Sequence, residues 1–83
     1  MIDLRHAVIK EHARLQMAKR QIAEADVRDV LNRPEAVISV RPGRVVAHSV
    51  IDGYLIRVFV DIDREPSEVV TAYRTSKIEK YRS

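Results

Sequence analysis

Hydrophobic and polar residues follow a helical period in the first part of the chain. Between residues 9 and 21 the apolar positions recur every three or four residues, as on one side of a helix. They form two stripes, with Leu15, Ala18 and Ile22 on one and Ala13 and Met17 on the other. This segment is therefore predicted to be a helix.

The apolar stripe then changes phase. Val27, Val30 and Leu31 define a new apolar face that does not continue the earlier one. A proline also removes a backbone donor and ends regular helix. We therefore predict a second helix that starts after a joint near Ile22–Glu24 and ends at Asn32–Pro34.

After residue 34 apolar and polar side chains alternate, which is the period of a β-strand. The clearest run has Tyr54, Ile56, Val58, Val60 and Ile62 on one side and Leu55, Arg57, Phe59 and Asp61 on the other. Strands are expected over residues 36–41, 44–51, 54–62 and 68–74. Pro42–Gly43 and Asp52–Gly53 supply the turns, and the second pair is a strong hairpin signal.

Simple alternation also assigns the faces of the last strand. It places Val70 and Ala72 on one face and Val69, Thr71 and Tyr73 on the other. By the same rule Tyr73 and Arg74 point to opposite sides of the sheet.

Consecutive strands joined by short turns predict an antiparallel meander. The expected fold is α+β, with two N-terminal helices packed on one face of an antiparallel sheet of about four strands. A short extended piece near Ile2–Arg5 is expected to add an edge strand. At the other end, Ser76 and Glu79 match a capping box and predict a short C-terminal helical turn.

The composition indicates one domain, residues 1–83, without disulfides or a membrane segment. The chain has no cysteine, and no apolar stretch approaches the ~18 residues of a membrane span. A cytoplasmic location is therefore expected. The net charge is +3, and eleven of the 15 basic residues are Arg, which forms forked hydrogen bonds to phosphate and carboxylate. The expected partner is a nucleic acid or an acidic protein.

The inventory of reactive groups fits one class of enzyme best. The three histidines, His6, His12 and His48, do not have the spacing of a metal site, so no metal or cofactor is expected. A ribonuclease without a metal uses the 2′-hydroxyl of RNA as nucleophile, and needs only proton transfer and a cation on the phosphate. The candidates for these tasks are His12, Arg20, Arg57, Tyr73, Arg74 and Lys77.

Each candidate also has an ordinary structural interpretation. Arg57 lies in mid-strand on a face with Leu55 and Phe59, and the alternative to a functional role is an ion pair with Asp61 or Glu68. Arg20 at a helix end suits the helix dipole. The tail residues Lys77, Lys80 and Tyr81 are candidates for RNA binding or a solvated terminus, and Arg41 and Arg44 beside the Pro–Gly turn are candidate phosphate contacts.

Two segments together resemble the family called domain of unknown function 4258. They are EHARLQMAKRQI, Glu11 to Ile22, and VVTAYRTSKIEKY, Val69 to Tyr81, with DVRDVLNRPEAVI and LIRVFVDID in the same order between them. The family is related to the RelE and BrnT toxins of bacterial toxin–antitoxin pairs. Those are small α+β proteins that cleave RNA, often mRNA, without metal and are silenced by an antitoxin. The resemblance implicates His12, Arg20, Tyr73, Arg74, Lys77 and Lys80, whereas Arg82 departs from the aromatic residue common at the end of the family.

The leading hypothesis is a type II toxin-like endoribonuclease that acts on mRNA, free or on the ribosome, and has a cognate antitoxin. His12 or Tyr73 would assist proton transfer, and Arg20, Arg74 and Lys77 would hold the scissile phosphate. This hypothesis expects groups from the first helix and from the C-terminal end of the sheet to meet in one pocket. The alternatives are a non-catalytic module that binds nucleic acid or an acidic protein, and a degenerate toxin that only binds its antitoxin.

Overall fold

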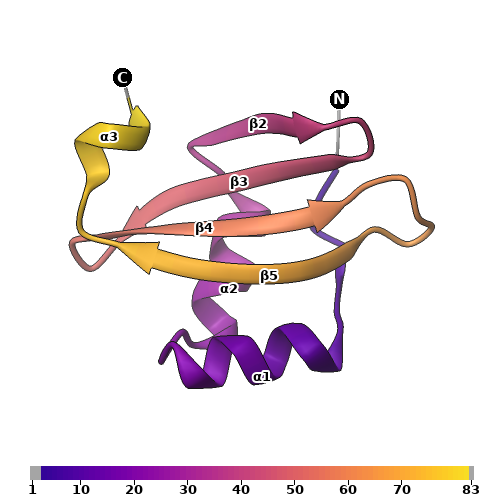
Figure 1. Cartoon of the computed structure of the whole chain (residues 1–83), viewed down its shortest axis with the longest axis horizontal. Coiled ribbons are helices and arrows are strands. Elements are labelled where there is room, and N and C mark those ends of the chain that lie inside the picture. Colours follow the sequence, from indigo (N-terminus) through magenta and orange to yellow (C-terminus); the bar gives the residue numbers. More distant parts are fainter. Residues whose placement is uncertain (1–2, 83) are drawn as a thin grey trace.

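The computed structural model describes residues 3–82, and over that span it contains three helices and five strands (Figure 1). The predicted α+β class is confirmed. The elements in chain order are β1 (Val8–Ile9), α1 (Glu11–Lys19), α2 (Glu24–Asn32), β2 (Ala36–Arg41), β3 (Arg44–Ile51), β4 (Tyr54–Asp61), β5 (Glu68–Thr75) and α3 (Ile78–Arg82). No helix in this part of the chain is both long and apolar enough to cross a membrane.

The strands form one sheet in the order β1-β5-β4-β3-β2. The four strands predicted from alternation pair antiparallel with their neighbours, as expected for a meander. The fifth, β1, pairs parallel with the start of β5, Val8 with Glu68 and Ile9 with Val69. The prediction of an added edge strand near Ile2–Arg5 was therefore wrong in position, and Ile2 lies outside the described residues.

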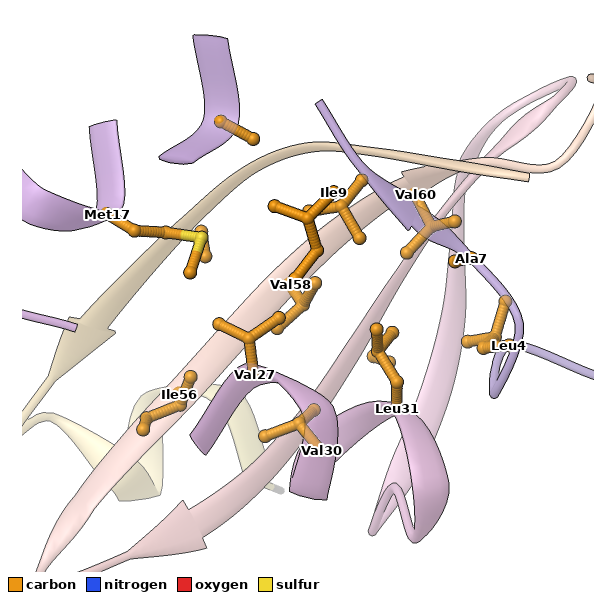
Figure 2. Close-up of a cluster of buried hydrophobic side chains, with 14 of the residues drawn as sticks. Leu4, Ala7, Ile9, Met17, Val27, Val30, Leu31, Ile56, Val58 and Val60 are labelled. Carbon is orange, nitrogen blue, oxygen red and sulfur yellow. The ribbon is translucent and has the colours of Figure 1, made fainter. Parts of the chain in front are cut away.

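Both N-terminal helices pack on one side of the sheet, which we call the helix face. α1 lies along β5 and α2 crosses β3 and β4 (Figure 1). The core between them is apolar and includes Val27, Val30 and Leu31 of α2, Met17 of α1, and Ile56, Val58 and Val60 of β4 (Figure 2). These side chains are 0–3% exposed to solvent, and Ile9 and Leu4 of the N-terminal segment, each 3% exposed, complete the same cluster.

The buried stripe of α1 is narrower than the sequence predicted. Ala13 and Met17 are buried, whereas Leu15 is 58% exposed and Ala18 is also exposed. The helix lies at the border of the sheet, along β5, so only one narrow side of it meets the core. Of the predicted stripe Leu15, Ala18 and Ile22, the first two are therefore exposed, whereas Ile22 is buried.

A β-bulge in β5 overturns the simple alternation predicted for that strand. Val60 pairs with Val69, but its neighbour Phe59 pairs with Thr71, so Val70 is an extra residue on β5. Val69 and Ala72 consequently share the helix face, where both are fully buried. After the bulge, Tyr73 stands on the opposite side of the sheet from them.

The hairpin turn lies at the predicted residues, whereas the C-terminal helix starts differently from the prediction. Asp52 and Gly53 join β3 to β4 with φ of 51° and 83°, as a two-residue hairpin turn requires. The C-terminal helical turn exists, but it begins at Ile78, and the bond at its start runs from the Lys77 amide to Thr75 Oγ1 at 3.0 Å. The predicted capping box at Ser76 is therefore not what starts α3.

Candidate nucleic-acid interface

Arg57 lies at the centre of the side of the sheet opposite α1 and α2. We call this side the front face; it carries Val46, Leu55, Arg57, Phe59 and Tyr73. β4 is flanked by strands on both sides, and Arg57 pairs across them with His48 of β3 and Tyr73 of β5. The guanidinium is half-buried, which is an unusual place for a charged group without a counter-ion.

Aromatic rings surround this guanidinium. Its central carbon lies 5.7 Å from the ring centre of Phe59, 5.8 Å from that of Tyr73 and 4.2 Å from that of Tyr81. Phe59 and Tyr73 also stack on each other, with ring centres 5.9 Å apart and planes inclined by 25°. Because Tyr81 belongs to α3, this contact also shows that α3 packs on the front face. Cation–π contacts of this kind stabilise a cation by roughly 0.5–2 kcal/mol each.

The predicted ion pairs of Arg57 do not form. Asp61 pairs with Arg44 at 2.6 Å, and Glu68 contacts Lys10 at 3.5 Å and Arg64 at 3.7 Å. Within the described residues, the hydrogen bond made by Arg57 goes from Nη1 to the phenolic oxygen of Tyr73 at 2.7 Å, and its buried Nε has no partner. Within the described residues the guanidinium therefore has no carboxylate ion pair, and Nη1 is the donor that it uses.

The two phenols beside Arg57 form a polarised pair. Burial, followed by the hydrogen bond with Tyr81, raises the pKa of Tyr73 above its ordinary value of 10.0. The same hydrogen bond lowers the pKa of Tyr81, and the nearby charges of Lys80 and Arg57 lower it further. The surroundings of the two neighbouring phenols therefore shift their pKa values in opposite directions. Environments that push two titratable groups apart in this way are typical of acid–base pairs.

Arg20 reaches the border of this cluster from the end of α1. Its Nη1 donates to Thr71 Oγ1 at 3.1 Å and to the carbonyl of Ala72 at 2.8 Å. Thr71 pairs with Phe59 on the front face, two residues before Tyr73. The side chain of Arg20 thus lies against β5 at Thr71 and Ala72, and it remains exposed to solvent.

The remaining sequence candidates lie elsewhere. His12 is exposed near the start of α1, eight residues and thus about 12 Å along the helix from Arg20. Arg74 pairs with Ile56 on the helix face and lies 4.8 Å from the ring centre of Tyr54. The placement of Tyr73 and Arg74 on opposite sides therefore agrees with the prediction. In the described part of the chain, no hydrogen bond, ion pair or ring contact joins His12 to Arg74 or Lys77.

The hairpin arginines are also distant from Arg57 along the sheet. Arg44 pairs with Asp61 at the far end of β3, and Arg41 ends β2 beside it. Lys77 is exposed after β5, and Lys80 has its ammonium 5.4 Å from the ring centre of Tyr81. The structure thus brings together Arg20, Arg57, Tyr73, Lys80 and Tyr81, and leaves His12, Arg41, Arg44, Arg74 and Lys77 outside.

Phe59 and Thr71 belong to this cluster and were not among the sequence candidates. Phe59 could have been found, because it is two residues from Arg57 and therefore on the same side of β4. Thr71 could not have been found in the same way, because its role depends on Arg20, 51 residues earlier in the chain.

The family DUF4258, a domain of unknown function, matches residues 9–74. The chain belongs to this family. The matched range includes Arg20, Arg57 and Tyr73, and it ends before Lys80 and Tyr81. No curated protein and no solved structure matches the chain. Membership in the DUF4258 family assigns no activity.

Proposed function

We propose that this DUF4258 domain is a toxin-like endoribonuclease of a type II toxin–antitoxin pair, which binds mRNA on the front face and cleaves it beside Arg57. One observation carries the proposal. A half-buried guanidinium lies in mid-sheet, hydrogen-bonded to the Tyr73 phenol, while Asp61, the carboxylate on the same side of β4, is engaged by Arg44. Its partners would be mRNA and a cognate antitoxin in the cytoplasm.

Arg57 and Arg20 are suited to hold the RNA backbone. Guanidinium groups bind phosphate oxygens through two parallel N–H donors, and such charge-assisted bonds are about twice as strong as neutral ones. Arg57 uses Nη1 for the Tyr73 phenol and its unpartnered Nε is buried, so the other amino group is the donor suited to a phosphate. Arg20 is exposed at the border of the same face. The rings of Phe59 and Tyr81 offer stacking surfaces for unpaired bases, which single-stranded RNA presents.

The polarised phenols are suited to the chemistry. In the proposed reaction the ribose 2′-oxygen attacks the adjacent phosphorus, so a P–O2′ bond forms and the P–O5′ bond breaks. Tyr81, whose pKa is lowered, accepts the 2′ proton as a phenolate. Tyr73, whose pKa is raised, gives its proton to the departing 5′-oxygen. The products are a 2′,3′-cyclic phosphate and a 5′-hydroxyl end, and one proton passing from Tyr81 to Tyr73 restores the starting state.

This assignment moves the reaction centre from the place that the sequence suggested. His12 and Arg74 were candidates for proton transfer and phosphate binding, but neither lies in the Arg57 cluster. Tyr81 replaces His12 as the proposed base, and Arg57 replaces Arg74 as the principal phosphate ligand.

The test is induced expression in bacteria, with recovery of cellular RNA and mapping of 5′-hydroxyl ends. The unaltered chain should arrest growth and produce such ends, and Tyr81→Phe should lose both by at least tenfold while remaining folded. Tyr54→Phe is the matched control, because Tyr54 is an exposed tyrosine that contacts Arg74 instead of Arg57. Equal toxicity and cleavage in the Tyr81→Phe and unaltered proteins would remove the catalytic proposal.

A second candidate is a module that binds RNA without cutting it. The stacked Phe59 and Tyr73 rings beside one cation favour it, because rings with an adjacent Arg are a common platform for unpaired bases. Binding whose log affinity falls by about 0.7 per phosphate for each log unit of salt, with no new RNA ends, would support this candidate. A tight complex with the neighbouring gene product, together with no RNA binding or toxicity, would instead identify a toxin that only binds its antitoxin.

A further inference from the structure

The N-terminal part of the chain is attached to β5 at two places. β1, which leads into α1, pairs with Glu68 and Val69 at the start of β5. Arg20 is the C-cap residue of α1, and its Nη1 donates to Thr71 Oγ1 at 3.1 Å and to the Ala72 carbonyl at 2.8 Å. One residue of β5 lies between these two attachments.

That residue is the β-bulge. Val70 is the extra residue on β5, and regular pairing with β4 resumes at Thr71 opposite Phe59. A strand with a bulge regains an uninterrupted ladder if the part beyond the bulge shifts by one residue. Such a shift moves every side chain beyond the bulge to the opposite face of the sheet. A contact just past Val70 therefore controls which side chains of β5 face the front.

Arg20 makes this contact in one register only. Its two acceptors belong to Thr71 and Ala72, the first two residues past the bulge. A one-residue shift of β5 would move these acceptors by ~3.3 Å along the strand and turn Thr71 to the helix face. Neither hydrogen bond would survive, because α1 fixes the origin of the Arg20 side chain. A contact present in one of two states favours that state.

We propose that Arg20 is a positioning residue: it holds β5 in the bulged register, with Thr71 opposite Phe59, and so keeps the Tyr73 phenol beside Arg57. Tyr73 directly follows Ala72, whose carbonyl accepts from Arg20. Its phenolic oxygen accepts from Arg57 Nη1 at 2.7 Å on the front face. The importance of this phenol for RNA cleavage rests on the proposed function, whereas its placement by Arg20 does not.

The first test is an ultraviolet titration of the phenols in the folded chain and in Arg20→Met. Methionine keeps an unbranched stem and removes the donors. Loss of the register contact should separate Tyr73 from Tyr81, so the pKa of Tyr81 should return towards 10.0. The change should be at least half of that produced by Tyr73→Phe, which removes the neighbouring hydroxyl outright.

Thr71→Val separates the register contact from the charge of Arg20. Valine keeps the branched shape of the side chain and removes one of the two acceptors, while the guanidinium remains. The pKa of Tyr81 should then shift in the same direction as in Arg20→Met, by a smaller amount. An unchanged titration in Thr71→Val would mean that Arg20 affects the phenols through its charge, and would refute the positioning role.

Arg14→Met is the matched control. Arg14 lies in the same helix, but its ion-pair partner is Glu24 at the start of α2. The variant therefore loses a charge and a contact of α1 without altering the attachment to β5. Its phenols should titrate as in the unaltered chain. Equal shifts in Arg14→Met and Arg20→Met would indicate a general loosening of α1 and would overturn the proposal.

The second test reads the register directly by NMR. In the bulged register the backbones of Phe59 and Thr71 face each other, and the rings of Phe59 and Tyr73 stack with centres 5.9 Å apart. The nuclear Overhauser contacts between these residues should persist in Arg14→Met and lose most of their intensity in Arg20→Met. Undiminished contacts in Arg20→Met overturn the proposal.

The outcome can be read even if one variant does not fold. Should Arg20→Met be unfolded, the milder Thr71→Val decides the question by the same two measurements. Neither measurement involves RNA, so a chain that fails to cut RNA still tests the role of Arg20. Conversely, a chain that cuts RNA but keeps its phenol titration in both variants would retain the proposed function and lose this inference.

Discussion

Nη1 of Arg57 lies 2.7 Å from the phenolic oxygen of Tyr73, its facing residue on the neighbouring strand. The bond uses one donor of a guanidinium that has five, and it fixes the plane of the group beneath the Tyr81 ring.

Replacing Arg57 by Met should abolish most RNA binding while leaving the fold intact. Methionine keeps an unbranched apolar stem among the rings and removes the cation. We expect at least a tenfold loss of affinity for single-stranded RNA, and a salt slope smaller by about 0.7. Fluorescence anisotropy at several salt concentrations measures both. Arg64→Met is the matched control, because Arg64 is an exposed arginine that contacts Asp61 and Glu68 instead of the rings. Equal losses in the two variants would contradict a specific role for Arg57.

The two phenols should have pKa values on opposite sides of the ordinary value of 10.0. The pKa of Tyr81 is lowered, so its phenolate forms below pH 10.0. The pKa of Tyr73 is raised, so this phenol ionises above pH 10.0. An ultraviolet titration of the phenols, compared between the unaltered chain and Tyr73→Phe, measures the effect. Loss of the Tyr73 hydrogen bond should move Tyr81 back towards 10.0.

The same directions predict how RNA cleavage responds to pH. Since the proposed base is the Tyr81 phenolate, the cleavage rate should increase as pH increases towards the pKa of Tyr81. It should decrease once Tyr73 loses the proton that it supplies. A rate that is flat with pH in this range, measured with a fluorescent RNA, would argue against the phenol pair.

Asp61→Asn should destabilise the fold and remove part of its acid sensitivity. Arg44 donates to this carboxylate at 2.6 and 3.2 Å and holds the pKa of Asp61 below its ordinary value of 3.8. A carboxyl group with a depressed folded pKa stabilises the protein above 3.8 and loses that contribution as pH falls through the folded pKa. We expect a loss of about 1–3 kcal/mol at neutral pH. Urea unfolding at neutral and acidic pH measures it, and the difference between the two proteins should shrink in acid.

Leu31→Ala should cost about 2–5 kcal/mol in the free energy of unfolding, because it leaves a cavity in the core. Leu31 is 1% exposed, between α2 and the sheet (Figure 2). The same substitution at Leu15, 58% exposed, should change the free energy by less than about 0.5 kcal/mol. Denaturant unfolding of the two variants measures the contrast. Similar losses would mean that α1 packs through Leu15, as its sequence stripe suggested.

Much of the fold could be predicted from local patterns. The period of two in β4 and the Asp52–Gly53 turn depend on neighbouring residues, and both are as expected. β1 could not be predicted, since two residues carry no period and become a strand only by pairing with Glu68 and Val69. The buried side of α1 could not be predicted, because the two apolar stripes are similar in the sequence. Which stripe is buried depends on the position of the helix at the border of the sheet.

The site was predicted in its residue types more than in its geometry. Arg57, Tyr73 and Tyr81 were all candidates, but their grouping depends on strand register and on where α3 lies. His12 and Arg74 were grouped with them through resemblance, which supplies positions along the chain and no distances. No local pattern showed that Arg57 would lack a carboxylate partner, because Asp61 lies on the same side of β4 and is taken by Arg44.

The additional residue at Val70 decides which side chain of the Tyr73–Arg74 pair faces the rings. In an uninterrupted strand Tyr73 would follow Val69 into the interior beneath the helices, and Arg74 would emerge beside Arg57. Two guanidinium groups would then repel each other where a phenol now accepts a hydrogen bond. The insertion thus allows one strand to meet two needs that a regular strand could not meet together: an apolar side chain in the interior at its beginning, and a phenol beside Arg57 at its end.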